Sequence, residues 1–224
     1  MAKAGFFGTI VLVGIGVGTY YALTKCKSCP DTFTGERREI AKTNIAGGKT
    51  TKTTIPLLYR WFPDEETMRI DYEVSHSSPR SSIENQNVTV VCWLYTYSYQ
   101  DDGDFHLIIG SSPNRNNAWF FSAEVSGLPR SSSRNYKYHD RLEKARDQFL
   151  EVIDDCPSCS PGRYVQSFFD KPLKVEVTGS LYWDTEHTGG RCCSGTTRQK
   201  DKFVYKSETP WEIHPVTDIH KVDK

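Results

Sequence analysis

The stretch NVTVVCWLYTYSYQDDGDFHLIIG, residues 87–110, decides the fold because two β-type runs flank a short acidic turn. Residues 87–99 are rich in Val, Thr and aromatic side chains, which favour pleated, half-buried strands. Residues 100–104 contain one Gly and three Asp, a composition typical of a turn. The run 105–110 is apolar again. The stretch therefore predicts a β-hairpin, and a third strand is expected at 118–127 (AWFFSAEVSG).

Downstream, the hydrophobic period changes to that of a helix. Residues 138–153 carry one apolar face of an amphipathic helix, made of Leu142, Ala145, Phe149, Val152 and Ile153. Two further strands are predicted at 173–184 and 211–222, and the polar segment 186–209 between them is expected to be a long exposed loop. This is the element order of the OB barrel. We predict a mainly β fold, a five-stranded OB-like barrel with one helix between strands 3 and 4.

The amino-terminal residues 4–24 carry no charge and are long enough to cross a bilayer as a helix. A cleaved signal peptide or a lipid attachment at Cys26 are the alternatives. We predict a transmembrane anchor over residues 1–25. Gly14 and Gly18 form a GxxxG motif that permits close helix packing in a homo-oligomer, although a generally glycine-rich span explains them equally well. The expected protein is a single-pass membrane protein with an extracytoplasmic body, despite the basic residues that follow the span.

Three further regions are expected after the anchor. Residues 26–56 are rich in Thr, Lys and Gly and predict a stalk or linker. Residues 57–86 are expected to form a short β extension, because apolar residues alternate in the stretches 55–62 and 68–76. The barrel domain is expected over residues 87–224. A chain of 224 residues has room for one ordinary domain with such appendages.

Composition argues against a strongly basic nucleic-acid binder. Lys plus Arg equals Asp plus Glu at 28 each, so the chain has no global basic excess. Trp93, Tyr95, Tyr97 and Tyr99 alternate along one predicted strand and could stack on a ligand or pack within the barrel. We expect a protein or oligosaccharide partner in preference to a nucleic acid.

Six of the seven cysteines fall in three close pairs. Cys26 with Cys29 and Cys156 with Cys159 form two CxxC pairs, which could supply a four-thiolate zinc site. Disulfides are the alternative, and they fit an oxidising compartment. Cys92 is expected to be a buried free thiol inside a strand.

Ionisable side chains recur along the predicted strands. Alternation places Asp104 with His106 on one strand face, and Glu212 with His214 on another. The candidate site consists of Asp104, His106, Glu124, Asp184, Glu212 and His214. Such a group could hold a divalent metal ion or perform acid–base catalysis, but structural hydrogen bonding is the leading interpretation. No cofactor is predicted, with a divalent metal as the alternative.

Four segments occur in a characteristic order: WLYTYSYQDDGDFHLII, SAEV, VEVTGSLYWDTEH and WEIHPVTDI. The pattern resembles a poorly characterised bacterial family with a Gly-Asp-aromatic-His-Leu element, a Thr-Gly-x-x-aromatic-x-Asp element and a closing Glu-x-His-Pro-Val element. The resemblance covers residues 87–222 and implies an OB-like body, more remotely similar to staphylococcal-type nucleases. It implies no settled activity, and no acid–arginine spacing here copies the nuclease site.

Three functions follow as hypotheses. The first is a membrane-anchored OB-like binding or assembly module without established catalysis. The second is a metal-dependent phosphodiesterase or nuclease-like hydrolase that uses Asp104, His106, Glu124, Glu212 and His214. The third is a structural subunit of a membrane complex.

Overall fold

The computed structural model describes residues 31–35, 38–154, 167–187, 196–199, 202–205, 207 and 209–222. The predicted anchor with Gly14 and Gly18 lies outside these residues, as do the three close cysteine pairs. Within the described ranges, no helix combines the length and the apolar character needed to cross a bilayer.

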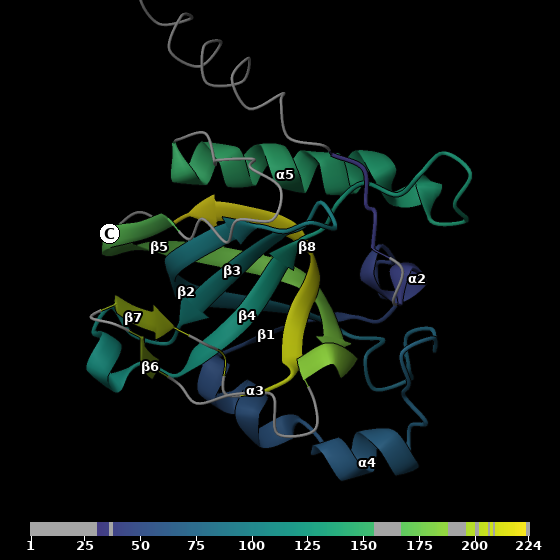
Figure 1. The fold of residues 1–224 in the computed structure, drawn as a ribbon, viewed down its shortest axis with the longest axis horizontal. Helices are drawn as coiled ribbons and strands as arrows, with labels where there is room; N and C mark the ends of the chain where they lie inside the picture. Colours follow the sequence, from purple (N-terminus) through teal and green to yellow (C-terminus); the bar gives the residue numbers. More distant parts are fainter. Residues whose placement is uncertain are drawn as a thin grey trace, which may run out of the picture.

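Five strands close into a mixed β-barrel (Figure 1). They are β2 (Asn87–Tyr99), β3 (Phe105–Gly110), β4 (Phe120–Val125), β5 (Ser167–Trp183) and β8 (Trp211–Lys221). The neighbours are β2-β3-β4-β8-β5, and β5 closes the barrel by pairing with β2. The β4–β8 pair is parallel and the other barrel pairs are antiparallel. The prediction of a mainly β five-stranded barrel is confirmed, and this arrangement is compatible with an OB-like barrel.

Alternate side chains of the barrel strands fill its interior. In β3 the buried core positions are Phe105, Leu107 and Ile109, while β4 contributes Phe121 and Ala123. Cys92 belongs to the same core and is a buried free thiol, as predicted. Because successive strand residues point to opposite faces, the residues between these positions point outward from the barrel wall.

The helix α5 (His139–Ile153) lies between the third and fourth barrel strands, as predicted, and crosses one end of the barrel (Figure 1). All five residues of the predicted apolar face are buried. The Phe149 ring packs against the rings of Tyr97 and Phe105, with centroids 5.4 and 5.1 Å apart. The helix therefore closes this end of the core.

The short β extension predicted over 57–86 is wrong, because two helices stand in its place: α3 (Ile55–Trp61) and α4 (Glu65–Ile70). Pro56 occupies the first turn of α3, where its fixed φ suits a helix. Asp64 caps α4, since its side chain accepts a hydrogen bond from the Thr67 backbone at 2.9 Å. These end signals outweigh the apolar alternation. Both helices lie at the end of the barrel opposite α5 (Figure 1).

The predicted stalk is also corrected, because its described part packs on the barrel. The segment contains α2 (Glu39–Lys42) and β1 (Thr50–Thr53), and β1 pairs in parallel with β2. The Phe33 backbone donates a hydrogen bond to the Leu128 carbonyl at 2.8 Å. A Cβ added at Gly127 would lie 2.8 Å from the Phe33 Cα, so this close approach requires glycine. Residues 31–35 and 38–47 therefore lie against the outer surface of the barrel.

The region 186–209, expected to be a long loop, contains a small hairpin of β6 (Thr196–Gln199) and β7 (Lys202–Tyr205). Short 3₁₀ turns complete the described structure: η1 (Arg115–Asn117), η2 (Tyr136–Tyr138) and η3 (Thr185–His187).

Candidate functional site

Strand register brings the predicted site residues together on the outside of the barrel wall. His106 of β3 pairs directly with Glu124 of β4. In the parallel β4–β8 ladder, Ser122 pairs with Glu212 and Ala123 with Ile213, so His214 follows beside Glu124. These polar residues alternate with the apolar residues that fill the core, and they therefore share the outer surface.

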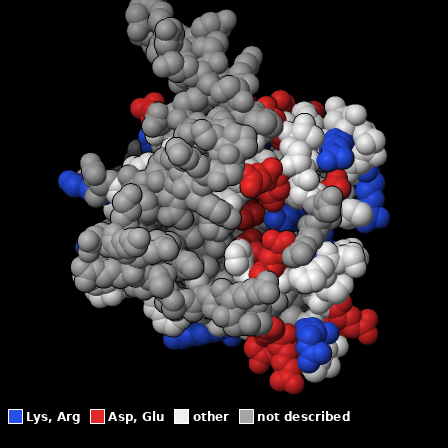
Figure 2. Space-filling model, in the orientation of Figure 1, with Lys and Arg blue, Asp and Glu red and all other residues white. Residues whose placement is uncertain are grey.

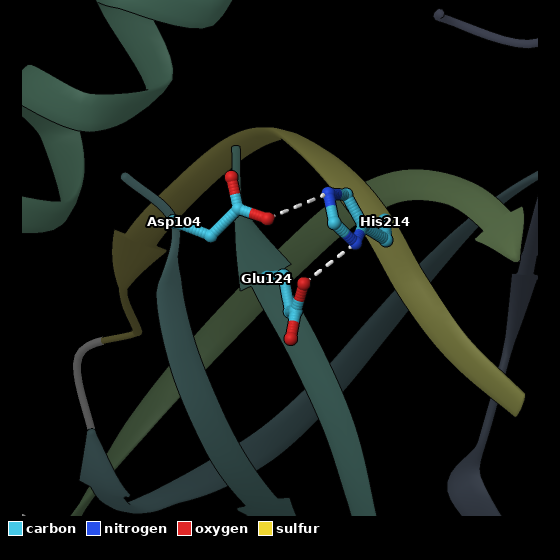
Figure 3. Close-up of side chains that lie close together, drawn as sticks. All are labelled: Asp104, Glu124 and His214. Carbon is cyan, nitrogen blue, oxygen red and sulfur yellow. Dashed lines mark ion pairs between the residues drawn. The ribbon is translucent and has the colours of Figure 1, made fainter. Parts of the chain in front are cut away.

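His214 lies between two carboxylates, Asp104 and Glu124 (Figure 3). Its Nε2 is 3.4 Å from Asp104 Oδ2, and its Nδ1 is 2.7 Å from Glu124 Oε2. Asp104 and His214 are fully buried, and Glu124 is 7% exposed. The three residues come from the turn before β3, from β4 and from β8, and we call them the central cluster.

The hydrogen bonding of the central cluster is incomplete. Asp104 Oδ1 accepts a hydrogen bond from the Gly127 backbone at 2.6 Å. In contrast, Asp104 Oδ2, Glu124 Oε2 and both ring nitrogens of His214 are buried and make no hydrogen bond of good angle within the described part of the chain, although His214 Nδ1 and Glu124 Oε2 lie 2.7 Å apart. Buried polar atoms are normally satisfied, so four such atoms in one place require an explanation.

Burial shifts the ionisation of these groups toward their neutral forms. It raises the pKa of Asp104 to about 7, although His214 and Lys42 oppose the shift. Burial likewise raises the pKa of Glu124, and it lowers the pKa of His214 to about 4. The His214 ring is therefore neutral at pH 7 and carries one N–H, although both of its nitrogens face a carboxyl group.

Lys42 supplies a cation at the edge of the central cluster. Its Nζ lies 3.2 Å from Asp102 Oδ2, 3.8 Å from Asp104 Oδ2 and 3.9 Å from Glu124 Oε2. Burial lowers the pKa of Lys42, but the attraction of these carboxylates outweighs it and raises that pKa well above its ordinary value. Sequence analysis missed Lys42, because the residue falls in the predicted stalk.

The remaining predicted residues extend the cluster toward solvent. Glu212 is 2% exposed, and burial together with Glu124 and Asp184 raises its pKa well above the ordinary range. Burial lowers the pKa of His106. Ligand atoms of His106, Glu124 and Glu212 all lie within 4.8 Å of one another.

At the outer edge, Asp184 is hydrogen-bonded to Nδ1 of His187. This bond raises the pKa of His187 above its ordinary value. Burial raises the pKa of Asp184, but its contacts with His187 outweigh burial and leave that pKa lowered. The His187 side chain is 53% exposed, so the cluster reaches the surface here. Sequence analysis missed His187, although its spacing of three residues from Asp184 was a usable signal.

The four aromatic residues proposed as a stacking platform do not share one face. A bulge between Leu94 and Thr96 shifts the register of β2. Tyr97 and Tyr99 consequently enter the main core, whereas Tyr95 packs with Phe120 in a separate cluster beside the half-buried Trp93. The three tyrosines are buried, so a continuous platform for bases or sugars is not formed.

A second group of buried charges lies on the same side of the barrel. The Arg38 guanidinium pairs with the Glu84 carboxylate through two hydrogen bonds of 2.9 and 2.8 Å. Both side chains are fully buried. Arg38 also stacks over the Tyr182 ring, and that ring lies 5.2 Å from the His214 ring. One aromatic side chain thus separates the two charged groups.

The surface charge is mixed where it is described. Figure 2 shows Lys and Arg side chains interspersed with Asp and Glu on the coloured part of one face. Comparison with protein-family models, with curated proteins and with solved structures finds no significant match. The function must therefore be inferred from the fold and from the site.

Proposed function

We propose that the protein is a metal-dependent hydrolase whose divalent ion is bound by Asp104, Glu124 and His214. The observation that carries this proposal is the set of buried, unbonded donor atoms that these residues bring together. One ligand atom from each residue lies within 4.8 Å of the others. Two carboxylates and one imidazole are a donor set suited to Mn²⁺, Fe²⁺ or Zn²⁺.

A purely hydrogen-bonded cluster requires that one of the carboxyl groups keeps its proton. A neutral imidazole has one N–H, yet both nitrogens of His214 face carboxyl oxygens. The second nitrogen can accept a hydrogen bond only from a protonated carboxyl group, and the pKa of Asp104, raised to about 7 by burial, agrees with such a proton in the metal-free protein. A metal ion bound between the side chains would take the place of this proton and offset the cost of burying the ionised carboxylates.

The number of ligands favours chemistry over a purely structural ion. Structural metal sites are commonly closed by four protein ligands, whereas catalytic sites keep a position for water. The ion would supply a hydroxide from its bound water and stabilise negative charge. His187, held by Asp184 and exposed to solvent, is suited to donate a proton to the leaving group.

A phosphate ester is the substrate class we favour. Hydroxide would form the new P–O bond, the P–O bond to the alcohol would break, and His187 would protonate the departing oxygen. The metal ion and the Lys42 ammonium would attract the anionic phosphate. Residues 1–25 would tether this activity to a membrane, with the body on the extracytoplasmic side.

Hydrolysis of bis(4-nitrophenyl) phosphate by the full-length chain tests this function. We expect turnover that requires Mn²⁺ or Zn²⁺ and falls at least a hundredfold in His214→Gln. His220→Ala is the matched control, because His220 is a half-exposed imidazole on the same strand. Turnover that is unchanged in His214→Gln, or absent with every divalent ion, would contradict the proposal.

A second candidate is a binding module, the hypothesis that the sequence favoured. The exposed Trp61 and Trp119, at 51% and 47%, support it because exposed aromatic rings suit sugar or protein contact. Glycan-array binding that is lost in Trp119→Ala, together with no hydrolysis by the wild type, would favour this candidate.

A further inference from the structure

We infer that the same face binds a second divalent ion through His106, Glu212 and the shared carboxylate of Glu124. The two ions would lie side by side with Glu124 between them. This inference rests on the proposed function, because Glu124 is also a ligand of the first ion.

The geometry of the outer strands provides the ligands. His106 and Glu124 are direct cross-strand partners, and Glu212 lies two residues before His214 on the same face of β8. Ligand atoms of His106, Glu124 and Glu212 fall within 4.8 Å of one another, as do those of the first site. A carboxylate has two oxygens with several lone pairs, so Glu124 can bind both ions.

Glu212 is the most deeply buried carboxylate of this second ligand set. Its side chain is almost completely buried. Nδ1 of the neutral His214 ring lies 3.8 Å from Glu212 Oε2, which is too far for a hydrogen bond. A divalent ion at this position would compensate the cost of burying the Glu212 carboxylate.

The charge of this face is compatible with two ions when an anionic substrate is bound. Four carboxyl groups of this face are at least nine-tenths buried: Asp104, Glu124, Asp184 and Glu212. Lys42 is the described cation that contacts two of them, at 3.8 and 3.9 Å. Lys42 and a protonated His187 offset two of these carboxylates, and the first ion offsets the other two. A second ion would therefore leave positive charge that attracts an anionic phosphate.

A neighbouring ligand set is less suitable for the second ion. Asp184, His187 and Glu212 also have ligand atoms within 4.8 Å of one another. However, both oxygens of Asp184 are already used, one by the Glu186 backbone at 2.8 Å and the other by His187. The geometry therefore points to His106, and the Asp184–His187 pair remains a proton donor beside the ions.

Two adjacent ions suit the hydrolysis of a phosphate ester. In two-metal sites, ions about 3.5–4 Å apart stabilise both the attacking and the leaving oxygen. The second ion therefore strengthens the assignment of a phosphate group as the part of the substrate that is bound.

Metal stoichiometry tests the inference directly. The full-length chain is dialysed against Mn²⁺, and bound metal per chain is measured by elemental analysis. We expect two ions in the wild type and in the control His220→Ala, one ion in His106→Ala and in Glu212→Gln, and none in Glu124→Gln. Circular dichroism melts without metal verify that each variant is folded. Spin coupling between Mn²⁺ ions, seen by electron paramagnetic resonance in the wild type, is expected to vanish in Glu212→Gln.

The outcomes separate this inference from the proposed function. One bound ion that is lost in His214→Gln but kept in His106→Ala would overturn the second site and leave the first intact. No bound ion in the folded wild type would overturn both. Two ions without spin coupling, or two ions in folded Glu212→Gln, would also overturn the inference, because the ions would then lie elsewhere.

Discussion

The Arg38–Glu84 pair and the central cluster are both buried on the outside of the barrel, yet their hydrogen bonding differs. All five N–H groups of Arg38 are used: Nε donates to the Ser78 carbonyl, and the two terminal nitrogens donate to Glu84 and to two further carbonyls. Glu84 also accepts hydrogen bonds from the backbones of Ser81 and Trp183. The central cluster instead leaves four buried atoms without a hydrogen bond.

The difference shows how the same barrel uses buried charge for two purposes. A charge network whose donors and acceptors are all satisfied fixes the surrounding chain, here by joining α2, the 78–84 segment and the end of β5. A network with unmet ligand atoms is organised for an additional charged species. We therefore assign structure to the first group and metal binding to the second.

Breaking the Arg38–Glu84 pair should have the largest effect on the free energy of unfolding. Glu84→Gln retains the shape of the side chain but leaves the buried Arg38 charge unpaired, so we expect a loss of about 3–5 kcal/mol in the free energy of unfolding. Urea denaturation measures this loss. Glu176→Gln is the control, because its Lys52 partner is largely exposed and should contribute less than about 1 kcal/mol. Equal losses in the two variants would contradict the structural assignment.

A metal ion bound at the central cluster should stabilise the folded protein. Mn²⁺ at about 100 times its dissociation constant should add ~2.7 kcal/mol per site to the free energy of unfolding. A thermal melt should therefore move to higher temperature in the wild type and by a smaller amount in His214→Gln, which keeps only the second site. Glu84→Gln should melt lower than the wild type yet show a similar upward shift with Mn²⁺. An identical shift in His214→Gln would place the ion outside the central cluster.

Removing Lys42 should sharpen the distinction between a metal site and an ion-pair network. Lys42→Met deletes a cation that competes with the metal for Asp104 and Glu124, so we expect Mn²⁺ to bind about tenfold more tightly, or ~1.4 kcal/mol. The metal-free variant should be less stable than the wild type, because the buried carboxylates lose their cation. Calorimetric titration measures the affinity. Weaker Mn²⁺ binding in folded Lys42→Met would argue against the competition.

The stability contributed by the Arg38–Glu84 pair should depend modestly on pH and should decrease as the pH falls. Burial raises the pKa of Glu84, but the hydrogen bonds and charge of Arg38 outweigh burial and leave that pKa below its ordinary value. A depressed carboxyl pKa stabilises the folded state above the unfolded pKa of roughly 4.3, and this stabilisation is lost as the pH falls through the folded value. The stability difference between wild type and Glu84→Gln should therefore be constant from pH 7 to 5.5 and shrink below pH 4.5, by at most ~1.4 kcal/mol per pH unit. A stability difference between wild type and Glu84→Gln that grows as the pH falls would contradict this prediction.

The barrel could be predicted from sequence because its signals are local. The runs 87–99 and 105–110 have strand composition and a clear turn between them, and the apolar period of 138–153 specifies a helix. The helices α3 and α4 were mistaken for strands because the alternation of a few apolar residues competed with capping and proline signals. In short helices, capping residues and a proline in the first turn determine where the helix forms.

The site was predicted in part for the same reason. Alternation along the strands places Asp104 with His106 on one face and Glu212 with His214 on another, and the structure shows that these faces point outward from the barrel. Lys42 could not be found in this way, because its contact with Asp102 joins residues 60 positions apart through tertiary packing. The completeness of the Arg38 network and the incompleteness of the central cluster also depend on atomic positions, which residue types alone do not specify.

Anomalous diffraction from crystals of the protein grown with Mn²⁺ tests the central claim most directly. The account predicts a peak within about 2.0–2.6 Å of carboxylate oxygens of Asp104 and Glu124 and of one ring nitrogen of His214. A central cluster without a peak, with Mn²⁺ found instead at a surface group such as His139, Asp140 and Glu143, would contradict it.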